Sequence, residues 1–362
     1  MNTPPPPFSC TYSPNVAELL TALGCSIVIT TYQAGKLIFI SPSDTNQLVQ
    51  LPRDFQKAMG LAIDGRRMAI ATKDEVIVLA DATGLAHNYP PNPHTYDALY
   101  LPRAIYHVGM VDLHDLDWDE QGSLWAVNTR FSCLSVINDH YSFTPKWFPP
   151  FIKAFEPVDY CHLNGMTMVN GEPKYVTMFG QTTTPKGWRP NVERDGLIMD
   201  VPTSEVVASN LKMPHSPRWI DGKLYCLLSA TGEVIQVDIA TGKYDVVVQL
   251  DGFVRGMAKW GDYLFVGMSK LRQNASTFRD LPIAQKAIYA GVEIIHLPTG
   301  VPVGHIRYQS SVEELYDVQI IPKLRPGILN HLTDVYRLAL NTPQFDYWSE
   351  PRPEKGHEQY FT

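Results

Sequence analysis

A strand–turn–strand pattern that recurs six times constrains the fold of this chain more than any other feature of the sequence. Each copy begins with a polar or small residue, continues with alternating apolar residues and ends in a tight turn. The six copies are residues 59–64, 114–119, 165–170, 216–221, 256–261 and 317–322. Their starts lie 55, 51, 51, 40 and 61 residues apart. Units of about 40 to 50 residues with this pattern are typical of propeller blades, so we predict an all-β, six-bladed β-propeller.

The two ends of the chain are predicted to share one blade. No strand pattern follows residue 322, and residues 328–340 favour a helix. Three unassigned strand patterns lie near the other end, at residues 26–31, 36–41 and 47–51. One C-terminal inner strand plus these three N-terminal strands would close the ring and remove its open sheet edges. We therefore predict a single propeller over residues 14–345, a disordered or extended tail over 1–13 and a C-terminal tail over 346–362.

Composition excludes several classes of partner. The 362 residues carry a formal net charge of −7, which argues against nucleic acid or an anionic membrane as a general partner. The five cysteines are widely spaced and form no CxxC pair, so we expect reduced, mostly buried thiols. The first eight residues show no secretory signal and no segment has about 20 consecutive apolar residues, so we expect a cytoplasmic protein without a membrane span. GxGxxG and P-loop motifs are absent, and we expect no nucleotide cofactor.

Polar side chains gather just before the predicted inner strands. In a four-stranded blade these segments lie at one mouth of the channel, together with the connections between second and third strands. The residues are His114, Asp115, His162, Asn164, His215, Arg218, Arg255, Tyr316 and Asp317. Counted back from the turns, His114 lies one position later and His162 two positions earlier than the others. A β-bulge or an altered loop would still bring the three imidazoles together. Polar groups converging in a cavity predict a binding or active site.

Two long connections are predicted on the same face, at residues 180–195 and 268–291. Compact connections usually have about 4–6 residues, so these are candidate binding loops. They carry Lys186, Trp188, Arg189, Lys270 and Arg272, and Arg130 lies in a shorter loop nearby. On an acidic protein these cations predict a locally positive mouth that attracts an anion such as a carboxylate, phosphate or sulfate.

Structural roles are the alternative for these residues. Asp115 next to His114 would orient its imidazole for acid–base work or binding, but the two side chains would also simply satisfy each other. A buried Arg255 needs an acidic partner, so it would otherwise form an internal ion pair with Asp317 or Asp115.

Several strings resemble those of a bacterial family of conserved hypothetical proteins. They include HDLDW from His114, HLNGM from His162, PHSPR from Pro214 and YDVQ from Tyr316, and the resemblance covers roughly residues 14–345. It implies a six-bladed propeller and no particular activity. The architecture is more distantly similar to gluconolactonase-like, strictosidine-synthase-like and streptogramin-lyase-like propellers. Histidines stand in place of the acidic and asparagine calcium set of the gluconolactonases, which argues against a lactonase mechanism.

Two functions remain open at this stage. In the first, the protein is an enzyme for a small anionic substrate. His114, His162 and His215 would act by acid–base chemistry in elimination, isomerisation or cyclisation, or would bind one divalent transition metal. Asp115, Tyr316 and Asp317 would join them as catalytic residues. Substrate binding would fall to Arg255, Arg218, Asn164, Arg130, Trp188, Arg189 and Lys270. In the second, the ring is a non-catalytic module for a ligand or a protein partner.

Overall fold

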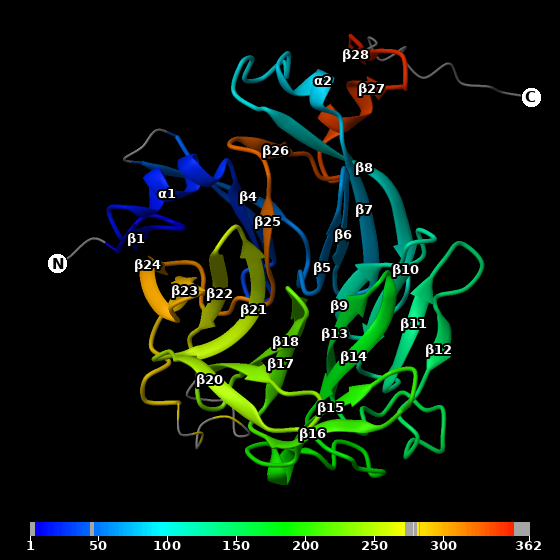
Figure 1. Ribbon diagram of the computed structural model, residues 1–362. Helices are drawn as coiled ribbons and strands as arrows, with labels where there is room; N and C mark the ends of the chain where they lie inside the picture. Colours follow the sequence, from blue (N-terminus) through cyan, green and yellow to red (C-terminus); the bar gives the residue numbers. More distant parts are fainter. Residues whose placement is uncertain (1–3, 44–46, 272–277, 279–280, 282, 351–362) are drawn as a thin grey trace, which may run out of the picture.

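Six β-sheets form a ring in the computed structural model, which describes residues 4–43, 47–271, 278, 281 and 283–350 (Figure 1). The chain is therefore a six-bladed β-propeller, as the repeat predicted. All six recurring segments coincide with inner strands. These strands are β25 (Val318–Ile321), β5 (Leu61–Asp64), β9 (Leu113–Trp118), β13 (Leu163–Val169), β17 (Pro214–Ile220) and β21 (Phe253–Trp260).

The remaining strands follow outward in each blade in chain order. The first blade adds β2 (Ser26–Thr31), β3 (Lys36–Pro42) and β4 (Leu48–Asp54). The second adds β6 (Arg67–Ala71), β7 (Glu75–Asp81) and β8 (Ala98–His107), and the third adds β10 (Leu124–Asn128), β11 (Cys133–Ile137) and β12 (Thr144–Trp147). The fourth adds β14 (Glu172–Met178), β15 (Gly196–Asp200) and β16 (Val206–Leu211). The fifth adds β18 (Lys223–Leu228), β19 (Glu233–Val237) and β20 (Tyr244–Gln249), and the sixth adds β22 (Tyr263–Ser269), β23 (Ala290–His296) and β24 (Val301–Tyr308).

The ring closes where the two ends of the chain meet. Strand β2 pairs antiparallel with β25, with Ser26 opposite Ile321. This confirms the predicted closing blade of one C-terminal and three N-terminal strands. Strands β2 and β3 are almost entirely buried because neighbouring blades cover both of their faces, so their Ile and Val residues run without alternation.

The prediction of a helix over residues 328–340 is wrong. Strand β26 (Pro326–Ile328) instead adds to the second blade, parallel to β8, and the chain continues through the short 3-10 helix η2 (Asp334–Leu338) into β27 (Ala339–Asn341). The N–H of Leu329 donates to the carbonyl of Tyr100 at 2.9 Å. Pairing with an existing strand satisfies the backbone groups of this segment, which outweighs its weak helical preference.

Both predicted tails have ordered parts. Strand β1 (Cys10–Tyr12) pairs with β24 as a fifth strand of the sixth blade, and helix α1 (Val16–Leu23) follows it. Strand β28 (Asp346–Trp348) forms a hairpin with β27 that lies beside α2 (Thr83–Ala86), outside the second blade (Figure 1). The indole of Trp348 donates to the carbonyl of Leu85 at 3.1 Å and anchors this hairpin.

Glycines alternate with polar residues where the inner strands meet. A Cβ at Gly60 would lie 2.8 Å from the Cα of Asp115, and one at Gly256 would lie 2.7 Å from the nitrogen of Val318. In the intervening blades, Asp115, Ser216 and Asp317 accept hydrogen bonds from N–H groups of the next inner strand. The bonds come from Met166 at 3.0 Å, Gly256 at 3.0 Å and Leu61 at 3.2 Å. The glycines allow the close approach, and the side chains between them fasten each blade to the next.

A second set of side-chain hydrogen bonds fastens the mouth of the channel. In four blades, a hydroxyl group at the end of the second strand donates to a backbone carbonyl of the next blade. The carbonyl belongs to the segment just before that blade's inner strand or to the start of the strand. The pairs are Thr30 to Met59 (2.7 Å), Thr129 to Leu163 (2.5 Å), Ser229 to Val254 (2.6 Å) and Ser269 to Leu315 (3.0 Å). These bonds hold the segments just before the inner strands in place.

The cysteine prediction is confirmed. All five cysteines are free thiols and four of them are buried, while Cys10 is partly exposed. Burial raises the pKa of Cys25 and Cys226 to about 12. In the part of the chain that the structure describes, no helix has the length and apolar character needed to cross a bilayer.

Alanine substitution at two glycines will test the close approach of the inner strands. Gly256 and Gly222 have similar backbone angles, with φ of +80° and +78°, but a Cβ at Gly222 meets nothing within 4 Å. We expect Gly222→Ala to lower the free energy of unfolding by about 1–2 kcal/mol because of its φ angle alone. Gly256→Ala should lose about 1–3 kcal/mol more through the clash with Val318. Equal losses in urea unfolding would contradict this account.

Candidate functional site

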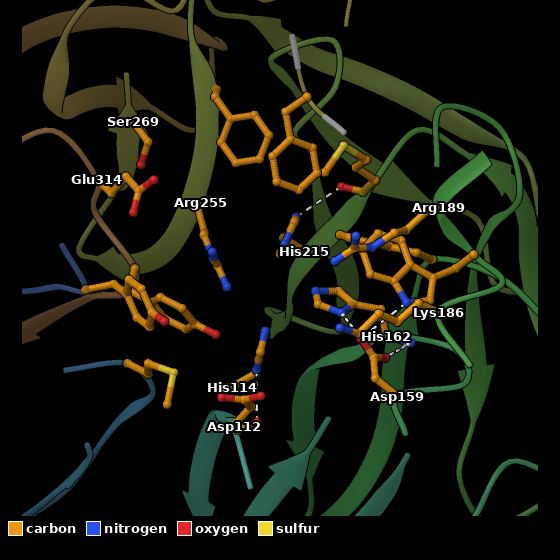
Figure 2. Close-up of a pocket in the computed structure, with 18 of the residues that line it drawn as sticks. Asp112, His114, Asp159, His162, Lys186, Arg189, His215, Arg255, Ser269 and Glu314 are labelled. Carbon is orange, nitrogen blue, oxygen red and sulfur yellow. Dashed lines mark hydrogen bonds and ion pairs between the residues drawn. The ribbon is translucent and has the colours of Figure 1, made fainter. Parts of the chain in front are cut away.

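A cavity of about 450 Å³ opens at one mouth of the channel. Its walls come from the segments before the inner strands and from the two long connections, which lie between second and third strands as predicted. Nine of the predicted site residues line it: His114, Arg130, His162, Trp188, Arg189, His215, Arg255, Lys270 and Tyr316. Figure 2 shows His114, His162 and Arg255 pointing toward the same space. Arg272 lies outside the described residues.

Irregular strand pairing brings the histidines into this cavity. The pairing of β9 with β10 shifts register between Ala126 and Asn128, and similar shifts occur where β13, β17 and β21 pair with their second strands. With the bulge included, His114 and His215 occupy equivalent places in their blades. Each comes just before a residue, Asp115 or Ser216, that accepts a hydrogen bond from the next inner strand. The expected offset of His114 is therefore absent from the folded chain. His162 stays two residues earlier, in the loop before β13.

His114 is held by the backbone and not by Asp115. Its Nδ1 lies 3.0 Å from the carbonyl oxygen of Asp112, which only accepts hydrogen bonds, so Nδ1 carries the proton and Nε2 is left as an acceptor. Burial lowers the pKa of His114 well below 6.5, and the nearby His162 and Arg255 lower it further. The imidazole is therefore neutral at pH 7.

His215 has the same arrangement in a more enclosed position. Its Nδ1 lies 3.1 Å from the carbonyl of Met213 and 2.7 Å from the hydroxyl of Ser229. That hydroxyl donates its proton to Val254, so Nδ1 of His215 is the donor and Nε2 is the acceptor. Burial, followed by the charge of Arg255, lowers the pKa of His215 well below 6.5.

His162 forms an imidazole–carboxylate pair with Asp159. Its Nδ1 lies 3.0 Å from one carboxylate oxygen, and its backbone N–H donates to the other at 2.8 Å. The indole of Trp188 donates to the same carboxylate at 3.2 Å. The imidazole also packs against Phe179 and Trp188, with ring centroids 4.6 and 4.4 Å away. A carboxylate that holds Nδ1 fixes the ring orientation and the tautomer, so Nε2 is the nitrogen that faces a ligand without a proton.

Left-handed backbone conformations are frequent around this cavity. Of the fifteen non-glycine residues with positive φ among the described residues, six line the cavity or the channel just below it. They are Asp112, Asp159, His162, Lys186, Met213 and Ser216. Each such residue costs about 1 kcal/mol, and this kind of strain is concentrated at functional sites.

Arg255 and Tyr316 form the opposite wall. The guanidinium of Arg255 lies 3.5 Å from the centroid of the Tyr316 ring, and no carboxylate of the described residues forms an ion pair with it. The Tyr316 hydroxyl is buried and has no hydrogen-bond partner in the described part of the chain, and burial raises its pKa well above 10. The wall therefore offers an available positive charge and an unsatisfied hydroxyl.

The side chains around the cavity carry more positive than negative charge. Arg130, Lys186, Arg189, Arg255 and Lys270 face three carboxylates, those of Asp112, Asp159 and Glu314. Lys270 lies 3.9 Å from Glu313, and Asp159 is occupied by His162 and Trp188. The balance fits the predicted positive mouth.

Four predicted site residues lie below the cavity. Arg218 crosses the channel to Asp115 and Asp317, each at 3.4 Å, and donates to the carbonyl of Met257 at 3.0 Å. Burial raises the pKa of both aspartates, that of Asp317 to about 7, while Arg218 opposes the shift. Asn164 bonds Thr177 and the carbonyl of His162. We assign these four a structural role in place of the expected catalytic and substrate-binding roles, and the internal ion pair suggested for Arg255 belongs to Arg218.

The geometry gives no support to a three-histidine metal site. Within the described ranges of the chain, no group of three or more His, Cys, Asp or Glu side chains is placed to hold a metal ion.

Comparison with known families identifies the chain. A family model described as Domain of unknown function (DUF4915) matches residues 14–329. The chain belongs to this family. A search of curated proteins finds no match.

Solved structures share the architecture of this DUF4915 member at low sequence identity. A chain in the crystal structure of a nidogen–laminin complex is 12% identical, with 83% of this chain and 99% of that chain covered and a TM-score of 0.50. A catalytically inactive virginiamycin B lyase from Staphylococcus aureus, crystallised with quinupristin, is 10% identical with the same coverage and a TM-score of 0.41. The first likeness supports the propeller fold alone, and the second is too distant to support any argument.

The sequence interpretation missed several residues that shape the site. Asp159 was detectable, because an aspartate three residues before a loop histidine often accepts its hydrogen bonds. Phe179 and Phe253 line the cavity, and Ser229 contacts the imidazole of His215. These three gave no such signal, because they come from other strands and loops.

Loss of the channel arginine will test its structural role. Arg218→Met leaves two buried carboxylates without their cation, and we expect a loss of about 3–5 kcal/mol in the free energy of unfolding. Lys259→Met is the control, because its 2.7 Å pair with the exposed Asp221 should be worth about 0–1 kcal/mol. Similar urea-unfolding midpoints for both variants would show that Arg218 does not compensate the buried charges.

Proposed function

We propose that this protein is an enzyme that binds a small anion at the channel mouth and moves a proton on it by histidine acid–base chemistry. One observation carries the proposal: three imidazoles have their Nδ1 atoms held by hydrogen bonds and border the same cavity as Arg255, which has no ion-pair partner among the described residues. Each imidazole thus keeps Nε2 as a basic nitrogen for the ligand.

Arg255 is the proposed anchor for the anion. Its guanidinium is placed over Tyr316 and has donors available for two oxygens of a carboxylate or phosphate. Lys186, Arg189 and Arg130 raise the local potential at the entrance and favour the approach of an anion.

His162 is the proposed base, because Asp159 orients it and stabilises the imidazolium that forms. In the reaction, Nε2 takes a proton from a carbon next to the bound carboxylate, and the electron pair moves onto the carboxylate group. Arg255 and the Tyr316 hydroxyl stabilise the resulting charge. Return of the proton at another atom, or loss of a leaving group, gives isomerisation, elimination or cyclisation.

Deuterium exchange will distinguish an enzyme from a plain binding module. Small carboxylic acids that bind the wild-type protein are incubated with it in D₂O, and loss of the α-proton signal is followed by NMR. We expect His162→Gln to slow exchange about 100-fold or more at unchanged affinity. Arg255→Met should weaken binding itself about tenfold. Acids that bind without any exchange would favour the non-catalytic alternative.

The affinity for sulfate is expected to depend on pH. In the free protein the pKa values of His114 and His215 lie well below 6.5. A bound anion favours the protonated imidazoles and raises both pKa values, so binding takes up protons and affinity rises as pH falls below about 6.5. Titration calorimetry should show a weaker pH dependence of affinity for His114→Gln than for the wild type. His140→Gln is the control and should keep the wild-type dependence, because His140 is 80% exposed. A pH-independent affinity would contradict the anion site.

A further inference from the structure

The cavity has an apolar side that the proposed proton transfer does not use, and it bears on the class of substrate. Phe179, Trp188, Met213 and Phe253 belong to one buried hydrophobic cluster and all line the cavity. They are contributed by strand ends and by the long connection of the fourth blade. This inference rests on the proposed function, because it concerns the same site.

The aromatic rings on this side pack into a continuous cluster, and the parts of them that reach the cavity form its apolar surface. Phe179 lies 5.3 Å from Trp188 and 5.1 Å from His215, and His215 lies 6.1 Å from Phe253, measured between ring centroids. His162, the proposed base, packs on Phe179 and Trp188 within the same surface. A flat apolar group bound here would contact rings along its length and place its neighbouring carbon beside the base.

The opposite wall is also aromatic and carries the proposed anchor, whereas the cations of the first side, Lys186 and Arg189, lie at the entrance. Tyr32 and Tyr316 stack at 6.2 Å, and Arg255 lies on the Tyr316 ring. The charged anchor and the apolar surface thus belong to different sides of a cavity of about 450 Å³, a volume within the usual range of small-molecule sites. This division fits a ligand with an anionic end and an apolar end.

Among the described residues, the aromatic side of the cavity offers few groups that would recognise sugar hydroxyls. Among the described residues that line the cavity there is no Asn, Gln or Thr. The hydroxyl of Ser269 donates to the carbonyl of Leu315 and accepts from its N–H, so it is already satisfied. Hydroxyls of a polyhydroxylated acid that lie against Phe179, Trp188 and Phe253 would lose hydration without replacement hydrogen bonds, because these ring faces offer none.

We infer that the substrate is a small aromatic carboxylate, with its carboxylate on Arg255 and its ring on the surface formed by Phe179, Trp188 and Phe253. The carbon between ring and carboxylate then lies beside His162. Its proton is more acidic than that of an aliphatic acid, because the ring delocalises the negative charge.

Calorimetric titration of the full-length protein with acetate, phenylacetate and gluconate tests the inference. We expect phenylacetate to bind about tenfold or more tightly than either of the others, because it alone buries an apolar ring. Phe253→Ala should weaken phenylacetate binding about tenfold and change acetate binding by less than about twofold. Phe131→Ala is the matched control, because this ring packs on Phe143 and Phe155 and does not line the cavity.

The outcomes separate this inference from the proposed function. Gluconate binding as tightly as phenylacetate, or acetate binding without any preference for the aromatic acid, would overturn the inference and leave the anion site standing. Failure of all three carboxylates to bind would overturn both. If Phe253→Ala does not fold, Phe253→Leu and the ligand series on the wild-type protein decide the question.

Discussion

The close approach of neighbouring inner strands around the channel is the constraint on which the rest of the structure depends. Glycines in alternate blades leave room for the next strand, and Asp115, Ser216 and Asp317 use that proximity to bond its backbone. Two of these three hydrogen-bonding side chains, Asp115 and Asp317, are buried carboxylates, and their charge needs a nearby cation. Arg218 supplies it by spanning the channel between them. The ring is thus held at its axis by polar contacts, while apolar side chains fill the space between blades.

The site is built directly on this framework. Asp115, Ser216 and Asp317 bond the backbone of the next inner strand. The residue before each of them, namely His114, His215 and Tyr316, lines the mouth and takes its position from this bond. Hydroxyl bonds such as that of Ser229 hold the same segments from the neighbouring blade and fix the imidazole tautomer. Because Arg218 already neutralises the buried carboxylates, Arg255 is left without an acidic partner among the described residues. A free guanidinium at the mouth is therefore a consequence of the charge balance below it.

Much of the fold was predictable because propeller blades repeat a local pattern. The alternation of apolar residues and turns located all six inner strands, and the shortage of strands at the C-terminus predicted the closing blade. The C-terminal segment 328–340 was mispredicted, because its pairing partner β8 lies more than two hundred residues away in sequence. For the site, most of the mouth residues and both long connections were found. Both Arg218 and Arg255 were predicted to bind substrate, whereas Arg218 forms the internal ion pair that had been the alternative for Arg255.

The sequence by itself determined which residues meet at the mouth, since strand order and blade topology follow from local patterns of turns and apolar residues. Tertiary structure alone decided what each of them does. Whether an arginine pairs internally or faces a ligand depends on side-chain directions across the channel, and these are set by bulges and by contacts between blades. The orientation of each imidazole likewise depends on a carbonyl or carboxylate whose position in space only the folded ring defines.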